Sequence, residues 1–167
     1  MKLFLLFLAL PLLIAAAPLR LLIITGGHEF EEQPFFEMFD AMPDIAYQSV
    51  SQPAANGLYG STRMDSVDAL VFYDMVQEIT PAHQAAFLAL LERGKGMVFL
   101  HHSLASYQAW DEFTAIRGGR YVLPESLPEA ERANASNYQH DVQVNVQIID
   151  PQHPVTQGVD DFQIHDE

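Results

Sequence analysis

The sequence contains no cysteine, and this absence excludes several kinds of chemistry. A chain without thiols cannot form disulfides, thiolate zinc sites or iron–sulfur clusters, and it has no cysteine nucleophile. Basic residues are also scarce, because 8 Lys and Arg stand against 22 Asp and Glu, which gives a formal net charge of −14 over 167 residues. Nucleic acids bind largely through cations that displace condensed counterions, so nucleic acid and anionic membrane surfaces are not expected partners. Any catalysis must use His, Asp, Glu, Ser, Thr or Tyr.

The first residues are typical of an export signal. Met1-Lys2 is followed by an apolar run over residues 3–14 and by Ala15-Ala16-Ala17. A positive start, a short apolar run and an A-x-A end predict a signal peptide over residues 1–17, and hence a secreted or periplasmic protein. The run is shorter than the ~20 residues of a transmembrane helix, so no stable membrane insertion is expected after cleavage. Pro18 would hinder cleavage directly before it, which leaves earlier cleavage or an uncleaved anchor as alternatives.

Four short apolar segments alternate with helical patterns in the remainder, which we interpret as one domain over residues 18–167. The apolar segments are residues 19–25, 45–50, 69–73 and 96–100, and the helical patterns are residues 34–42, 80–93 and 110–116. Thr80 suits a helix cap, Pro81 a first helical position and Gly94 a left-handed terminator. Residues 51–64 predict a loop, and residues 142–148 alternate apolar and polar side chains as a half-solvated strand does. The pattern predicts an α/β fold with a doubly wound, mostly parallel sheet.

Ionisable side chains follow three of the four predicted strands. His28 and Glu29 follow the first strand, Asp74 the third, and His101 and His102 the fourth. Ligands of open parallel sheets bind outside the carboxyl ends of the strands, so we predict that these side chains line one crevice. The structural alternative is that one histidine of the pair caps the next helix while the other packs against a neighbouring strand.

The His101-His102 pair stands where a sharp strand-to-helix turn would thrust one side chain into the crevice, as in the nucleophile elbow of hydrolases. An imidazole there can act as a general acid or base or bind a metal. Together with His28, His140 and a carboxylate, the pair would suit a divalent metal ion. The chain lacks H-E-x-x-H, the dinucleotide fingerprint, the P-loop and G-x-S-x-G. No cofactor is therefore assigned, and a divalent metal is kept as an alternative.

Four blocks of the chain, in this order, resemble the ThuA-like (trehalose utilisation) family: residues 22–28, residues 94–110, residues 118–121, and residues 153–158 with Phe162, Asp166 and Glu167. The resemblance implies a flavodoxin-like fold of the class I glutamine amidotransferase-like superfamily and a role in sugar metabolism, in some members with keto-disaccharides. Glutaminase relatives carry a cysteine at the elbow, so this chain cannot perform their thioester chemistry. The family pattern continues beyond Asp-Glu into a tyrosine, so we expect a domain shortened at its C terminus, with an exposed sheet edge.

The resemblance, carried over residue by residue, implies a pocket made of residues from all parts of the domain. Its candidate catalytic residues are His101, His102, Glu29, Asp74 and Asp166, and its candidate substrate-binding residues are His28, Trp110, Tyr121, His140 and Glu167. Trp110 and Tyr121 suit a sugar because aromatic faces stack on pyranose rings, although Trp110 would serve equally well as a core anchor.

These observations favour a secreted sugar-processing enzyme of hydrolase or isomerase type. His101 or His102 would act as general acid or base, with Glu29, Asp74 or Asp166 as the acidic partner. The alternatives are a non-catalytic sugar-binding or scaffold domain and a metal-dependent hydrolase. The expected partners are a small-molecule carbohydrate and further copies of the chain in a homo-oligomer.

Overall fold

The computed structural model describes residues 17–166 of the chain. The predicted signal peptide, apart from Ala17, lies outside the described residues, and so does Glu167. The chain forms two compact units, Met1–Arg120 and Tyr121–Glu167, which are taken in turn.

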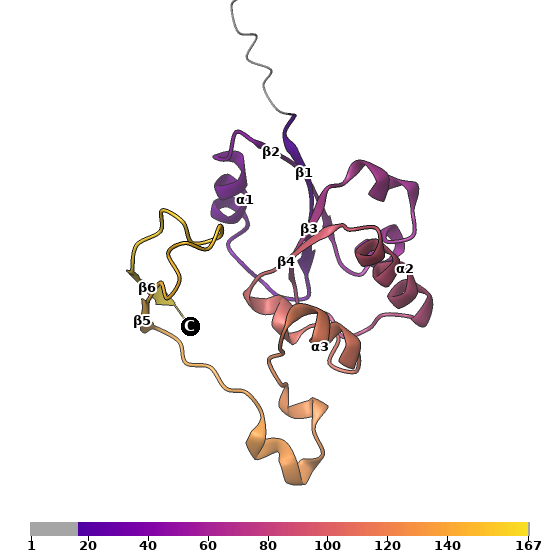
Figure 1. Ribbon diagram of the computed structural model, residues 1–167. Coiled ribbons are helices and arrows are strands. Elements are labelled where there is room, and N and C mark those ends of the chain that lie inside the picture. Colours follow the sequence, from indigo (N-terminus) through magenta and orange to yellow (C-terminus); the bar gives the residue numbers. More distant parts are fainter. Residues whose placement is uncertain (1–16, 167) are drawn as a thin grey trace, which may run out of the picture. The chain divides into compact units, whose positions relative to one another are not determined.

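The first unit is built on a four-stranded parallel sheet in the order β2-β1-β3-β4 (Figure 1). The strands are β1 (Leu19–Gly26), β2 (Ile45–Ser51), β3 (Ala69–Asp74) and β4 (Gly96–Phe99). Each lies within one residue of its predicted bounds, because an apolar segment that ends at turn residues marks a strand. The buried positions are those of the central strands β1 and β3, whereas β2 and β4 have only exposed and half-buried residues. This order is the flavodoxin-like one, which confirms the predicted α/β fold class.

Two hydrophobic cores lie on opposite faces of this sheet. The helices that cover it are α1 (Glu32–Asp40), α2 (Pro81–Glu92) and α3 (Asp111–Arg117). Side chains alternate along a strand, so Ile23 packs toward Phe39 of α1, whereas its neighbour Ile24 packs into the core that includes Phe87 of α2 and Phe113 of α3. Figure 1 shows α1 on one side of the strands and α2 on the other. The sheet is therefore doubly wound, as predicted.

The ends of α2 follow the predicted capping signals. The Thr80 hydroxyl accepts a hydrogen bond from the His83 main-chain N–H at 3.3 Å, and Pro81 occupies the first turn. Gly94 adopts φ +75° directly after the helix, a conformation that favours glycine.

The loop predicted over residues 51–64 is more ordered than expected. It contains the 3₁₀ helix η1 (Ala54–Leu58) and the first part of η2 (Thr62–Ser66). Asn56, Tyr59 and Met64 are buried there. Short 3₁₀ turns bury single side chains without producing the hydrophobic periodicity by which longer helices are found, so the pattern gave no sign of them.

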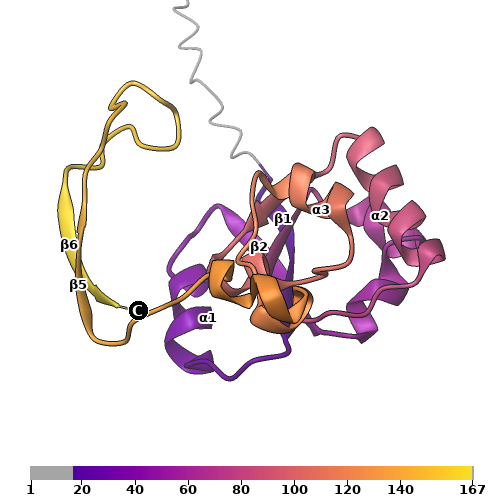
Figure 2. The same cartoon turned by 90° about the horizontal axis from the view of Figure 1, so that it is seen from below.

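The second unit consists of two 3₁₀ helices and a β-hairpin. The 3₁₀ helices are η4 (Pro124–Ser126) and η5 (Glu129–Asn134), and β5 (Val142–Val146) pairs antiparallel with β6 (Phe162–Asp166) (Figure 2). Strand β5 confirms the alternating pattern but ends two residues earlier than predicted, and β6 was not predicted as a strand. Val144 stands opposite Ile164, whereas Gln143 and Gln163 bond on the other face, with 2.8 Å between Nε2 and Oε1. Within residues 17–166, no helix is long and apolar enough to cross a membrane.

Candidate functional site

Two glycines fix the conformation of the loop after β1. Gly26 and Gly27 adopt φ +107° and +87°, and a Cβ atom on Gly27 would collide with the Met75 carbonyl. The Met75 N–H donates to the Gly26 carbonyl at 2.8 Å, which ties this loop to the one after β3. Glycine is required here because the backbone approaches closely in a left-handed conformation. His28 therefore leaves β1 at a defined point on the carboxyl edge of the sheet.

A sharp turn follows β4 at the histidine pair. The Leu100 N–H still donates to the Phe72 carbonyl at 2.8 Å, and the 3₁₀ helix η3 (His101–Ala105) begins at the next residue. His101 adopts φ +22°, which is unusual for a residue with a side chain. His101 is exposed and His102 is half-buried. This backbone has the features of the turn that the sequence predicts at this position.

Histidines from two strand ends meet at this edge. The rings of His28 and His102 stack with centroids 3.9 Å apart and planes 12° apart. His101 lies 4.7 Å from His102, and the Tyr73 ring meets the edge of the stack 4.7 Å from His28. The structure thus brings His28, His101 and His102 together, as the strand-end argument predicts. We call these three residues the histidine cluster.

Both ring nitrogens of His28 lie close to main-chain carbonyl oxygens. Its Nε2 is 3.0 Å from the Tyr73 oxygen, and its Nδ1 is 3.1 Å from the Glu29 oxygen. A carbonyl oxygen only accepts hydrogen bonds, so a neutral ring can donate to one of the two and an imidazolium to both. The nitrogens of His28 are therefore engaged by the main chain, and the ring serves to orient His102 through stacking. His101 and His102 are the members better suited to proton transfer.

Asp74 lies outside the histidine cluster. Its neighbour Tyr73 faces His28, and because successive side chains on a strand alternate, Asp74 points to the opposite face of the sheet. The Asp74 carboxyl is fully buried and accepts a 3.2 Å hydrogen bond from Gln52 Nε2. Burial raises the pKa of Asp74 to about 7, an effect that the Gln52 hydrogen bond partly offsets.

Asp74 belongs to a buried network of amides and phenols. Gln52 Nε2 also donates to the Tyr107 hydroxyl at 2.8 Å, and that hydroxyl donates to Asn56 Oδ1 at 2.7 Å. Tyr59 is the second phenol, 3.2 Å from Gln52 Nε2. Burial raises the pKa of both tyrosines above the ordinary value, so they remain neutral donors and acceptors. The network joins the segment after β2 to the segment after the histidine pair.

Arg117 of α3 braces the turn that carries the histidines. Its Nη1 donates to the carbonyls of Ser103 at 2.7 Å and Ser106 at 2.8 Å, and its Nε donates to that of Gly119 at 2.7 Å. Burial lowers the pKa of Arg117 to about 10, so the guanidinium remains charged at neutral pH. The Arg117 cation thereby binds the carbonyl of one residue of η3 and the carbonyl of the residue directly after η3.

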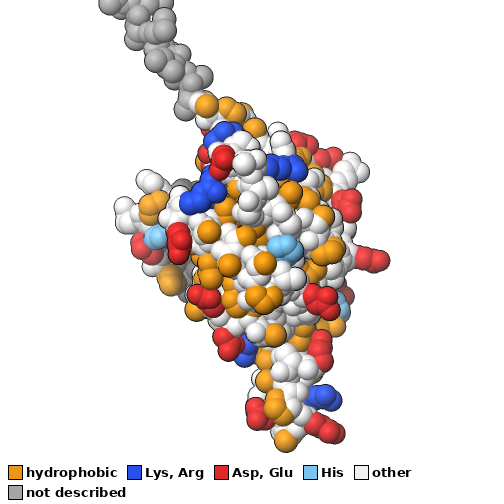
Figure 3. All heavy atoms as spheres, turned by 90° about the vertical axis from the view of Figure 1, so that its right-hand side faces the viewer, with side chains coloured by type: hydrophobic (Ala, Val, Ile, Leu, Met, Phe, Trp, Pro, Cys, Tyr) orange, Lys and Arg blue, Asp and Glu red, His pale blue; other side chains and the backbone are white. Residues whose placement is uncertain are grey.

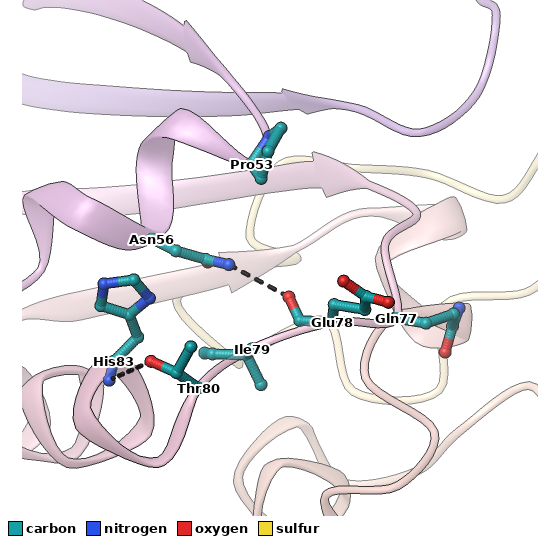
Figure 4. A pocket seen from close by; sticks show the side chains of 7 residues that line it. All are labelled: Pro53, Asn56, Gln77, Glu78, Ile79, Thr80 and His83. Carbon is teal, nitrogen blue, oxygen red and sulfur yellow. Dashed lines mark hydrogen bonds between the residues drawn. The ribbon is translucent and has the colours of Figure 1, made fainter.

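A separate open pocket of about 480 Å³ lies at the start of α2 (Figure 4). Its lining residues are Pro53, Asn56, Gln77, Glu78, Ile79, Thr80 and His83. Asn56 Nδ2 donates to the Glu78 carbonyl at 3.2 Å, which closes one wall. His83 is half-exposed and lines this pocket. Figure 3 shows the face that bears α2, with hydrophobic side chains toward its middle and acidic side chains around them.

The remaining candidates are Glu29, which is next to His28 in the chain, Trp110 in the core, and residues of the second unit. Glu29 is exposed on the β1–α1 loop beside His28. Trp110 is 7% exposed and stacks on Phe113 at 5.3 Å, so it is a core residue. In the second unit, the Tyr121 hydroxyl lies 3.3 Å from the Ser136 carbonyl, His140 is exposed, and Asp166 is exposed on β6. Among residues 17–166, no group of three or more His, Asp or Glu side chains is arranged to hold a metal ion.

The comparisons with known proteins agree with this architecture. The sequence profile of the ThuA family, described as trehalose utilisation, matches residues 20–167. The chain belongs to the ThuA family. Its fold is similar to the crystal structure of a ThuA-like protein from Bacteroides uniformis, with a TM-score of 0.65 and 18% sequence identity. That alignment covers 95% of this chain and 63% of the other, so the chain spans less than two thirds of its relative's length. No curated protein matches the sequence.

Sequence reasoning missed two aromatic residues beside the histidine cluster of this ThuA-family chain. Tyr73 contacts both His28 and His102, and Phe30 lies 5.5 Å from His28 and 5.2 Å from Tyr73. Strand alternation could have identified Tyr73, because it places residues 73 and 74 on opposite faces. Phe30 lies in a loop, where no periodicity indicates the direction of a side chain.

Proposed function

We propose that this ThuA-family protein acts on a carbohydrate by acid–base chemistry at the histidine cluster. The observation that carries the proposal is the 3.9 Å stack of His28 on His102, with His101 at the adjoining turn. Two imidazoles at the carboxyl edge of a parallel sheet stand where substrates of such folds bind, and imidazole exchanges protons near neutral pH. The family's description as trehalose utilisation supports a sugar as the substrate.

Each residue of the cluster has a distinct part in this proposal. His102 or His101 gives or takes a proton at a sugar oxygen or carbon, in a reaction of hydrolase or isomerase type. His28 is a positioning residue, since both of its ring nitrogens face main-chain carbonyl oxygens and its ring stacks on His102. Glu29 is the acidic partner on the same loop. Asp166, Tyr121, His140 and Glu167 are kept as candidates on the family resemblance alone.

The decisive experiment replaces both proton-transfer candidates. We expect His101→Ala with His102→Ala to lower turnover of trehalose or a keto-disaccharide by about 10²–10⁴-fold, the usual contribution of general acid–base catalysis. NMR of the sugar signals measures turnover, and circular dichroism verifies the fold. His83→Ala is the matched control, because His83 lies in the separate pocket. Undiminished turnover in the double variant would remove the cluster from the mechanism.

A non-catalytic sugar-binding domain is the second candidate. It is favoured by the exposure of His101 and Glu29, because a site open to water excludes competing solvent poorly. If calorimetry shows that trehalose or a keto-disaccharide binds, and neither sugar is turned over, the protein is a sugar-binding domain rather than an enzyme.

We also propose that residues 1–17 direct export, on the strength of their positive start, apolar run and A-x-A end. Fractionation of cells that express the full chain and a variant lacking residues 2–17 tests this. The full chain is expected outside the cytoplasm and the shortened one inside, and equal distribution would refute export.

A further inference from the structure

The candidate site needs an aromatic face, a role that the sequence analysis gave to Trp110 and Tyr121. Pyranose rings bind proteins largely through their apolar C–H face, which stacks on an aromatic ring, while hydroxyl groups bond to polar side chains. Trp110 cannot serve, because it is 7% exposed and its ring packs among Phe87, Tyr107 and Phe113.

Phe30 is an aromatic residue on the loop that carries His28 and Glu29. It is half-buried, so the residue is partly accessible to solvent. Its ring lies 5.5 Å from His28, 5.2 Å from Tyr73 and 5.2 Å from Phe35. The T-shaped contacts with Tyr73 and Phe35, at 78° and 77°, hold the ring from two sides. A phenylalanine held in this way presents a fixed surface and loses little side-chain entropy when a ligand binds.

The surroundings of this ring have the composition of a sugar site. Next to it in the chain is the exposed carboxylate of Glu29, and on its other side is the His28–His102 stack. This loop thus carries an aromatic ring, a carboxylate and the His28 imidazole, and its position is set by the close approach of Gly27 to Met75. A sugar ring stacked on Phe30 would lie beside His28, which stacks on His102.

We propose that Phe30 is the platform on which a pyranose ring of the substrate stacks, and that it selects ring-closed sugars over open-chain polyols. This inference rests on the proposed carbohydrate function and assigns the ring-binding part of that same site. An open-chain polyol has no flat C–H face, so it gains nothing from the phenyl ring.

The test measures trehalose binding to the full chain with Phe30→Leu and Phe30→Trp. Leucine keeps an apolar side chain but removes the aromatic face, so we expect about five- to tenfold weaker binding of trehalose and unchanged weak binding of sorbitol. Phe30→Trp should retain or strengthen trehalose binding. Phe36→Leu is the control for loss of aromatic packing, since Phe36 makes a T-shaped contact with Phe30 at 6.5 Å, stacks on Tyr47 at 5.9 Å and shows no ring contact with His28 in the described part of the chain. Dissociation constants come from NMR titration, and thermal melting monitors folding.

The possible results separate this inference from the proposed function. If Phe30→Leu binds trehalose as the wild type does, while the His101/His102 double variant loses binding or turnover, the platform is wrong and the histidine site stands. Equal losses of trehalose and sorbitol binding in Phe30→Leu would also overturn the platform, because they would indicate a general disturbance of the loop. If the wild type binds neither trehalose nor a keto-disaccharide, the proposed function fails and the inference fails with it.

Discussion

At the residue scale, Tyr73 and Asp74 show how one step along a strand separates two kinds of chemistry. Tyr73 faces the histidine cluster, whereas the next side chain enters a buried network on the other face of the sheet. A buried carboxyl favours its neutral form, because the low-dielectric interior solvates the anion poorly. Asp74 is therefore a residue whose ionisation couples to folding rather than one that meets a ligand beside the histidines.

The pKa of about 7 predicts a specific pH dependence for Asp74. An unfolded aspartate titrates near 4, so from about pH 4 to pH 7 the folded state holds a proton that the unfolded state has lost. The free energy of unfolding then falls as pH rises through this window. Asp74→Asn removes this contribution. We therefore expect the free energy of unfolding of the variant, relative to that of the wild type, to rise by about 2–3 kcal/mol from pH 5 to pH 8. Urea unfolding at each pH measures it.

The control for this experiment is Glu92→Gln, which removes an exposed carboxylate from α2. The difference in the free energy of unfolding between Glu92→Gln and the wild type should stay nearly constant over the same pH range. A constant difference for Asp74→Asn as well would show that the Asp74 carboxyl is ionised in the folded protein throughout.

At the scale of elements, neighbouring residues determine the bounds of some segments, whereas contacts with distant residues hold others in place. Helix α2 begins and ends where Thr80, Pro81 and Gly94 predict, because capping acts over a few neighbouring residues. The 3₁₀ helix η3 is held from a distance instead, by the guanidinium of Arg117 on α3. The turn that presents His101 and His102 thus depends on a residue at least fifteen positions away in the sequence.

Replacing Arg117 should loosen that turn. Arg117→Met removes the charged donor from the carbonyls of Ser103 and Ser106, although that of Ser103 keeps the Ser106 N–H, so we expect a loss of about 2–3 kcal/mol in the free energy of unfolding. Faster amide hydrogen exchange over residues 101–106 should accompany it. Arg117→Lys keeps the charge but not the forked geometry, so its stability and its exchange rates should lie between those of the wild type and those of Arg117→Met. Unaltered exchange in Arg117→Met, measured by mass spectrometry, would show that η3 is held by other contacts.

At the scale of the whole molecule, buried residues are confined to the first unit. Every buried residue of the described chain lies between Leu21 and Phe113, and the described part of the second unit has only exposed and half-exposed side chains. Burial of apolar side chains is the main favourable contribution to folding, so the first unit holds the groups that stabilise the domain.

This distribution predicts that residues 18–120 fold without the second unit. We expect cooperative thermal unfolding with a midpoint within about 5 °C of the full chain, because no buried side chain is removed. A shorter chain of residues 18–100, which lacks Trp110 and Phe113, is the contrasting variant and should not fold cooperatively. Non-cooperative melting of residues 18–120 would show that the first unit requires the second.

The sequence by itself determined the parallel strands, the doubly wound α/β class, the ends of α2 and the exclusion of thiol chemistry. These properties follow from composition, hydrophobic periodicity and capping, which act within a few residues. It also indicated that His28, His101 and His102 would meet, because the carboxyl ends of parallel strands share one edge.

Only the tertiary structure decided which strand-end groups share a surface. Asp74 faces a different layer from His28, and Trp110 fills the core while Phe30 lies beside the histidines. The burial and direction of these side chains depend on partners brought together from distant segments, such as Gln52 for Asp74 and Tyr73 for Phe30. A local pattern does not identify partners from distant segments, which is why the histidine cluster and, through strand alternation, Tyr73 were predictable, whereas the place of Phe30 was not.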